Sequence, residues 1–196
     1  RLKNVVWYPL YPLLGWTLAR VTGLETHHAL TAVSWACICA ASMVMLALLR
    51  RHFYNRLPTP SPGKDQDVTR RWDLTPADTG ALWGVALLLY GPCSIFLYAN
   101  FTESLFVLLL ASFLLAIQSR AWWWAAGIAA VASASRSQGC LFAPVLFLAF
   151  MFRSDIAGSV KRTFIALVLG AIGGLGVCAY MLYLYVQFGD PLAFVH

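Results

Sequence analysis

The sequence predicts an all-α fold, a polytopic bundle of transmembrane helices with short interfacial or re-entrant helices. Hydrophobic residues make up 60% of the 196 residues and charged residues only 11%, whereas about a quarter of an ordinary soluble domain is charged. The apolar residues also come in blocks of about 15 to 25, the length that an α-helix needs to cross a hydrocarbon core of about 30 Å. We therefore expect one transmembrane domain that takes up all of 1–196.

The expected elements follow from these blocks and from the residues that interrupt them. The segment at about 5–21 contains Pro9 and Pro12 and is too short and interrupted for a span, so we predict an interfacial or re-entrant helix. A polar loop is expected at about 50–76. The expected spans lie at about 28–49, 79–98, 102–118, 121–135, 140–152 and 164–188.

Two of these spans have internal features that predict their geometry. The span at 79–98 should break near Gly91 and Pro92, because proline lacks an amide hydrogen and clashes with the preceding helical turn. The last span contains glycines that should permit close helix packing, namely Gly170, Gly173, Gly174 and Gly176.

The charges indicate how the chain lies in the membrane. If the spans alternate, 50–76, Arg120 and 153–162 fall on one side with about ten of the fourteen basic residues, which makes that side cytoplasmic. Basic residues confined to short connectors form no face for nucleic acid. We expect a multi-pass integral protein of the bacterial inner membrane or, in a eukaryote, the endoplasmic reticulum. The cysteines lie in apolar blocks and His27–His28 is a weak signal, so no metal site is predicted.

The opposite, luminal or periplasmic side collects four polar segments, at 7–12, 98–104, 135–139 and 188–191. Glu103 and Asp190 are candidate catalytic carboxylates there, because ionisable groups near a membrane are costly. Each has a structural alternative: Glu103 fits a capping box with Asn100 as N-cap, and Asp190 follows a helix-stop glycine. Arg136 offers a planar fork to a phosphate, or simply snorkels to the surface.

The remaining binding candidates surround these three residues. Tyr8 and Tyr11 are able to stack on a sugar, although aromatic residues at an interface commonly form a belt. The full set of predicted substrate-binding residues is Tyr8, Tyr11, Tyr98, Thr102, Ser104, Arg136, Ser137 and Gln138.

Four stretches, Pro-Leu-Tyr-Pro, Tyr-Ala-Asn-Phe-Thr-Glu-Ser-Leu-Phe, Ala-Ser-Arg-Ser-Gln-Gly and Phe-Gly-Asp-Pro-Leu-Ala-Phe-Val-His, resemble the PIG-V type of GPI mannosyltransferase and its bacterial relatives. The resemblance implies a GT-C glycosyltransferase, which transfers a sugar from a polyprenyl-phosphate donor such as dolichyl-phosphate-mannose at the luminal face. It implies no cofactor. It also places the principal catalytic base before Arg1, which leaves Glu103 and Asp190 as supporting groups.

The expected function is therefore transfer of a mannose-like sugar from such a donor to a lipid-linked, GPI-like or other acceptor. The expected partners are membrane lipids, the donor, the acceptor and a small membrane subunit, with no nucleic acid. Two alternatives stay open. Broken and glycine-rich helices also suit a transporter or flippase of a lipid-linked sugar, and a glycine-rich span also suits a non-catalytic membrane subunit.

Overall fold

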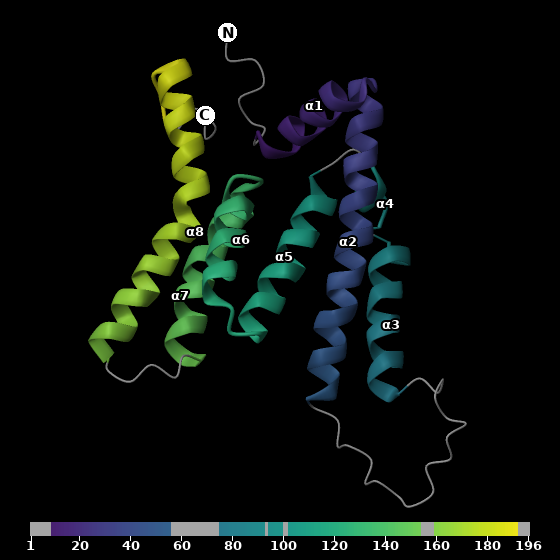
Figure 1. Cartoon of the computed structure of the whole chain (residues 1–196), viewed down its shortest axis with the longest axis vertical. Coiled ribbons are helices and arrows are strands. Elements are labelled where there is room, and N and C mark those ends of the chain that lie inside the picture. Colours follow the sequence, from purple (N-terminus) through teal and green to yellow (C-terminus); the bar gives the residue numbers. More distant parts are fainter. Residues whose placement is uncertain (1–8, 56–74, 93, 100–101, 154–158, 192–196) are drawn as a thin grey trace, which may run out of the picture.

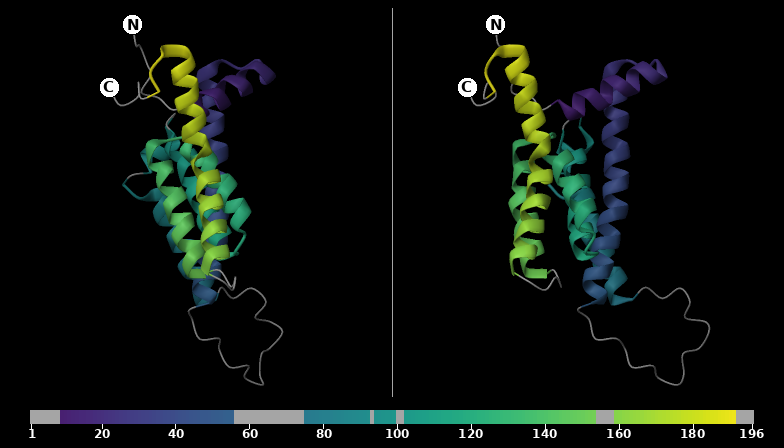
Figure 2. Two further views of the ribbon diagram at one scale, coloured as in Figure 1. Left: turned by 90° about the vertical axis from the view of Figure 1, so that its left-hand side faces the viewer. Right: turned by 60° about the vertical axis from the view of Figure 1, so that its left-hand side comes forward.

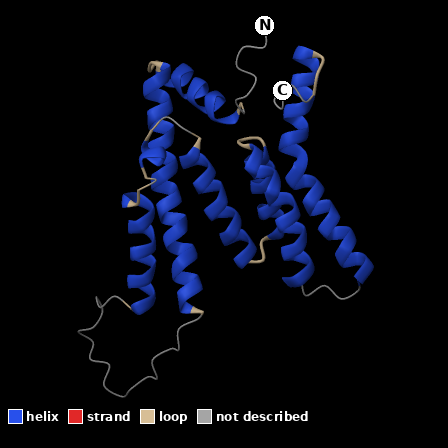
Figure 3. Ribbon diagram, turned by 180° about the vertical axis from the view of Figure 1, so that it is seen from behind, coloured by secondary structure: helices blue, strands red, loops and turns tan. Residues whose placement is uncertain are grey.

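The computed structural model describes residues 9–55, 75–92, 94–99, 102–153 and 159–191, and throughout these ranges the regular elements are helices (Figures 1 and 3). The all-α prediction is confirmed for this part of the chain. The elements in order are α1 (Leu10–Thr22), α2 (Thr26–Tyr54), α3 (Pro76–Tyr90), α4 (Ile95–Tyr98), α5 (Glu103–Gln118), α6 (Trp122–Ser133), the 3₁₀-helix η2 (Ser137–Leu141), α7 (Phe142–Arg153) and α8 (Ser159–Phe188).

Two helices are long and apolar enough to cross a membrane. They are α2, with 29 residues, and α8, with 30 residues. The other predicted spans are also helical, but α5 has only 16 residues, which correspond to about 24 Å at a rise of about 1.5 Å per residue. A membrane-spanning helix needs about 20 residues. Length and composition therefore identify two membrane-spanning candidates among the described helices, where the sequence predicted six.

The predicted break in the span at 79–98 is confirmed. Helix α3 ends at Tyr90, and α4 begins only at Ile95. The start of α3 is also well specified, because Thr75 accepts a hydrogen bond from the Asp78 amide, the Asp78 carboxylate accepts one from the Thr75 amide, and Pro76 occupies the first turn. Several boundaries differ from the prediction: α8 begins at Ser159 instead of 164, α2 ends at Tyr54 instead of 49, and α1 begins after Pro9 instead of at about 5.

An ion pair joins the ends of α2 and α3. Arg50 Nε lies 2.5 Å from Asp78 Oδ1. The hydrogen bond from the Thr75 hydroxyl, together with that from Arg50, holds the pKa of the Asp78 carboxyl below its usual range.

We expect acid to weaken the contact between α2 and α3. A lowered folded-state pKa stabilises the fold above the carboxyl's unfolded pKa, and this stabilisation is lost as the pH falls through the folded value. The unfolding temperature of the wild-type protein should therefore fall on acidification by more than that of Asp78→Asn. Identical pH dependence in the two proteins would contradict this role for Asp78.

The main core lies between α5, α6, α7 and α8. Phe113, Leu146, Phe150 and Leu169 are fully buried there. The facing side of α6 is almost entirely alanine, which lets its neighbours approach closely. Many large apolar side chains on the outer helix faces stay exposed, including Trp83, Leu87 and Trp124.

Some glycines of α8 pack closely against neighbouring helices, and one has free space where a side chain would lie. A Cβ at Gly173 would lie 3.1 Å from the Ala129 Cβ, and a Cβ at Gly176 would lie 1.9 Å from the carbonyl oxygen of Ala130. The Ser133 hydroxyl donates a hydrogen bond to the Gly173 carbonyl at 3.1 Å. The predicted close packing is thus confirmed and joins α8 to α6, whereas Gly174 has nothing within 4 Å of its Cβ position.

Candidate functional site

The beginning of α5, the end of α6 and η2 lie at the same end of the helix assembly (Figures 1 and 2). The upper parts of α2 and α8 extend beyond them on two sides, and α1 lies across this end at a steep angle to α2. Three of the four polar segments predicted to share a face, those containing Tyr11, Glu103 and Arg136, therefore lie near this end. The fourth follows the upper end of α8.

The centre of the candidate site is an ion pair between Glu103 and Arg136. Arg136 Nη1 donates a hydrogen bond to Glu103 Oε1 at 2.6 Å, and the two side chains are 28% and 30% exposed. Glu103 is the first residue of α5, where the positive end of the helix dipole favours a carboxylate. Arg136 lies in extended backbone between α6 and η2. The pair therefore joins two segments that are 33 residues apart in sequence.

The position of Arg136 is fixed by its other neighbours. Its Nε donates a hydrogen bond to Gln138 Oε1 at 3.2 Å, and its guanidinium carbon lies 5.8 Å from the centre of the Phe106 ring. The turn behind it requires a glycine, because a Cβ at Gly139 would lie 1.9 Å from the Ala132 carbonyl oxygen. Within the described part of the chain neither of these hydrogen bonds uses Nη2, which leaves this group of the arginine fork to donate to an anion.

Glu103 also lines an apolar cavity. The cavity has a volume of about 360 Å³, and its described lining comes from the end of α3, the break between α3 and α4, α4 itself and the beginning of α5. Glu103 Oε2 is buried without a hydrogen-bond partner among the described residues, as is the adjacent Ser104 hydroxyl. An unsatisfied buried carboxylate oxygen costs free energy, and a hydrogen bond from a ligand hydroxyl would offset that cost.

The structural alternative for Glu103 is wrong in its details. Thr102, and not Asn100, is the N-cap residue of α5, and among the described residues its side chain makes no capping hydrogen bond. Glu103 is therefore the first helical residue instead of the third, and its carboxylate pairs with Arg136. Asn100 itself lies outside the described residues.

Tyr11 is buried within the junction between α1 and α2. Its hydroxyl lies 2.7 Å from Ser34 Oγ and donates a hydrogen bond to the Leu30 carbonyl at 3.1 Å. Burial raises the pKa of this phenol, and only 4% of the residue is exposed. In this conformation the Tyr11 side chain holds α1 in place and is not presented to a ligand.

Tyr11→Phe should lower the free energy of unfolding by about 0.5–1.5 kcal/mol, the usual net value of a hydrogen bond, because the Ser34 and Leu30 oxygens lose their partner. Chemical unfolding in detergent measures this effect. The matched control is Tyr185→Phe, because Tyr185 is exposed on α8 and should be neutral. Equal effects of the two substitutions would contradict the role assigned to Tyr11.

Of the other predicted residues, some lie beside the ion pair and one stabilises the helices around it. Ser137 and Gln138 lie beside Arg136, and Ser104 is next to Glu103. The Tyr98 hydroxyl donates a hydrogen bond to the Leu89 carbonyl at 3.1 Å, and this bond connects α4 to α3 across the break.

Two predictions concern the edges of the described chain. Asp190 follows Gly189, which has the positive φ of 72° expected of a helix-stop glycine. Tyr8 lies outside the described residues.

Phe106 and the cavity were not predicted. Phe106 lies one helical turn after Glu103, so its i+3 spacing was a usable signal that it shares a face with the carboxylate. The cavity depends on how the broken helix packs, for which the sequence has no local signal. No protein-family profile, curated protein or solved structure matches the chain.

Proposed function

We propose that this protein is a membrane glycosyltransferase that moves a mannose-like sugar from a polyprenyl-phosphate donor to a lipid-linked or other acceptor. The observation that carries the proposal is the Glu103–Arg136 ion pair, of which Glu103 also lines an apolar cavity of about 360 Å³. A lipid phosphate has the matching chemistry, because its head group is anionic and its chain is apolar. Arginine also suits phosphate better than lysine does, since its fork donates two parallel hydrogen bonds.

The membrane arrangement that accompanies this proposal is multi-pass. Helices α2 and α8 span the bilayer, and the four shorter helices, which are below the usual length of a span, extend through the bilayer only between them, namely α3, α5, α6 and α7. The beginning of α5 and the end of α6 lie below the upper parts of α2 and α8 (Figure 1). These two polar helix ends are therefore recessed towards the hydrocarbon. In that position the charges gain strength from the low dielectric, and a lipid-linked substrate reaches them without leaving the membrane.

The proposed reaction is a single displacement at the anomeric carbon of the sugar. The acceptor hydroxyl oxygen forms a bond to that carbon while the bond from the carbon to the phosphate oxygen breaks, and a carboxylate takes the hydroxyl proton. Arg136 stabilises the negative charge on the leaving polyprenyl phosphate. Glu103 orients Arg136 and accepts a hydrogen bond from the acceptor through Oε2, and Asp190 has a supporting role in acceptor binding.

The second candidate is a flippase of a lipid-linked sugar, which the break between α3 and α4 favours, since transporters use interrupted helices at their binding sites. The transferase is preferred because the charged groups lie at one end of the helices, whereas transporter sites usually lie near the bilayer midplane. The third candidate, a non-catalytic subunit, loses support because Gly173 and Gly176 pack against α6 within the same chain.

An assay in proteoliposomes distinguishes these candidates. The full-length protein is reconstituted with radiolabelled polyprenyl-phosphate-mannose and a lipid acceptor, and both the labelled product and the donor in each leaflet are measured. The proposal predicts new labelled acceptor. Movement of intact donor between leaflets without product would indicate the flippase, and neither product nor movement across a panel of acceptors would favour the subunit.

A further inference from the structure

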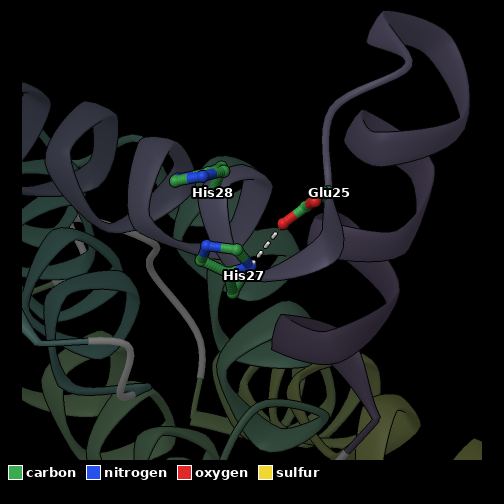
Figure 4. A group of neighbouring side chains, drawn as sticks. All are labelled: Glu25, His27 and His28. Atoms are coloured by element: carbon green, nitrogen blue, oxygen red, sulfur yellow. Dashed lines mark ion pairs between the residues drawn. The ribbon is translucent and has the colours of Figure 1, made fainter.

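The corner between α1 and α2 brings together three potential metal ligands that have no role in the proposed sugar transfer. Gly23, with a φ of 73°, ends α1 and reverses the chain, and Glu25 is the N-cap residue of α2. One potential ligand atom each from Glu25, His27 and His28 lies within 4.8 Å of the other two. Figure 4 shows the Glu25 carboxylate directed at the His27 ring, with the His28 ring beside them.

The spacing of the first two ligands fits a tetrahedral ion. Glu25 Oε2 and His27 Nδ1 are 3.3 Å apart. Two ligands at about 2.0–2.1 Å from a tetrahedral zinc ion are separated by about 3.3–3.4 Å. The His27 and His28 ring centres lie 3.8 Å apart, and a ligand atom of the exposed His28 lies within 4.8 Å of the other two, which places a third ligand beside the same ion.

The ligand types also select a class of ion. Two imidazoles and one carboxylate suit zinc and its first-row neighbours, whereas calcium and magnesium prefer oxygen ligands alone. Three protein ligands leave a fourth position open for water. The positive end of the α2 dipole works against a cation at this place, and the Glu25 carboxylate offsets that effect.

A simpler account of the same contact is a surface pair between Glu25 and His27, whose side chains are 76% and 61% exposed. Exposed pairs contribute little to stability. That account explains the contact between Glu25 and His27 but gives no role to His28. We propose that Glu25, His27 and His28 bind one Zn²⁺ ion per chain at this corner. The site is separate from the sugar-transfer proposal, and its test measures metal and not turnover.

The test is isothermal titration of the full-length protein with Zn²⁺, in detergent, after removal of any polyhistidine tag. We expect one equivalent of zinc to bind. His27→Ala, His28→Ala and Glu25→Gln should each weaken binding by at least about tenfold, since loss of even an outer-shell partner of a metal costs about 10- to 100-fold. All three positions are exposed, so the variants should keep the thermal unfolding profile of the wild type.

The matched control is His52→Ala, which removes the exposed histidine near the other end of α2 and should leave zinc affinity unchanged. Three results would overturn the site: no binding by the wild type, the same loss from His52→Ala, or unchanged affinity in Glu25→Gln. In each case the surface pair alone would account for the contact.

Discussion

Gly176→Ala is expected to destabilise the protein by at least about 1–3 kcal/mol, the usual cost of forcing an extra methyl group into a packed interface. The new Cβ would lie 1.9 Å from the Ala130 carbonyl oxygen and 2.8 Å from the Ala134 amide nitrogen. Both are backbone atoms of the α6 end and cannot turn aside as a flexible side chain would. Helix α8 must therefore shift away from α6, and unfolding in a denaturing detergent should show the loss.

The control for this prediction lies two residues away. Gly174 is on the same helix and has nothing within 4 Å of its Cβ position, so Gly174→Ala adds helix propensity without a clash. It should be neutral or stabilising by up to about 1 kcal/mol. Equal destabilisation by Gly174→Ala and Gly176→Ala would show that α8 does not pack on α6 through this face.

Arg136→Gln should weaken binding of a polyprenyl phosphate by about 10- to 100-fold, because a hydrogen bond to a charged group contributes about 1.5–3 kcal/mol. Titration of the protein in lipid nanodiscs measures the dissociation constant. Arg20→Gln is the matched control, since Arg20 lies near the end of α1 beside the Trp16 ring, away from the ion pair. It should bind the lipid as the wild type does.

Loss of Arg136 also leaves Glu103 without its ion-pair partner, which alone weakens the site. The double variant Glu103→Gln/Arg136→Gln removes that unpaired charge and separates the two effects. We expect the double variant to bind the lipid phosphate as poorly as Arg136→Gln does. Recovery of wild-type affinity would mean that Arg136 serves only to neutralise Glu103.

The sequence was sufficient where a local feature determines the structure. Pro92 breaks the predicted span between α3 and α4, and Gly189 ends α8, because each residue restricts or extends its own backbone conformation. Alternation of apolar blocks also placed Glu103 and Arg136 at one end. These predictions needed only the order of helices along the chain.

The sequence was insufficient where the packing of distant segments determines the contacts of a side chain. The local pattern around Glu103 predicted a capping box, but the segment after α6 brings Arg136 within 2.6 Å of the Glu103 carboxylate, an ion pair between distant residues for which the local sequence has no signal. The sequence predicted a sugar-stacking or interfacial role for Tyr11, but its contact with Ser34 buries it in the junction of α1 and α2. Helix lengths differed because the hydropathy of a segment does not fix where its hydrogen-bond ladder ends.

The central claim, sugar transfer at the Glu103–Arg136 pair, is tested most directly by the rate of mannose transfer from polyprenyl-phosphate-mannose by full-length wild type and Glu103→Gln, side by side. The substitution keeps the size of the side chain and removes its charge. Our account predicts measurable turnover by the wild type and a loss of about 10- to 100-fold in kcat/KM for the variant, or about 1.4–2.7 kcal/mol of transition-state stabilisation. Equal turnover by the two proteins, or none by the wild type, would contradict it.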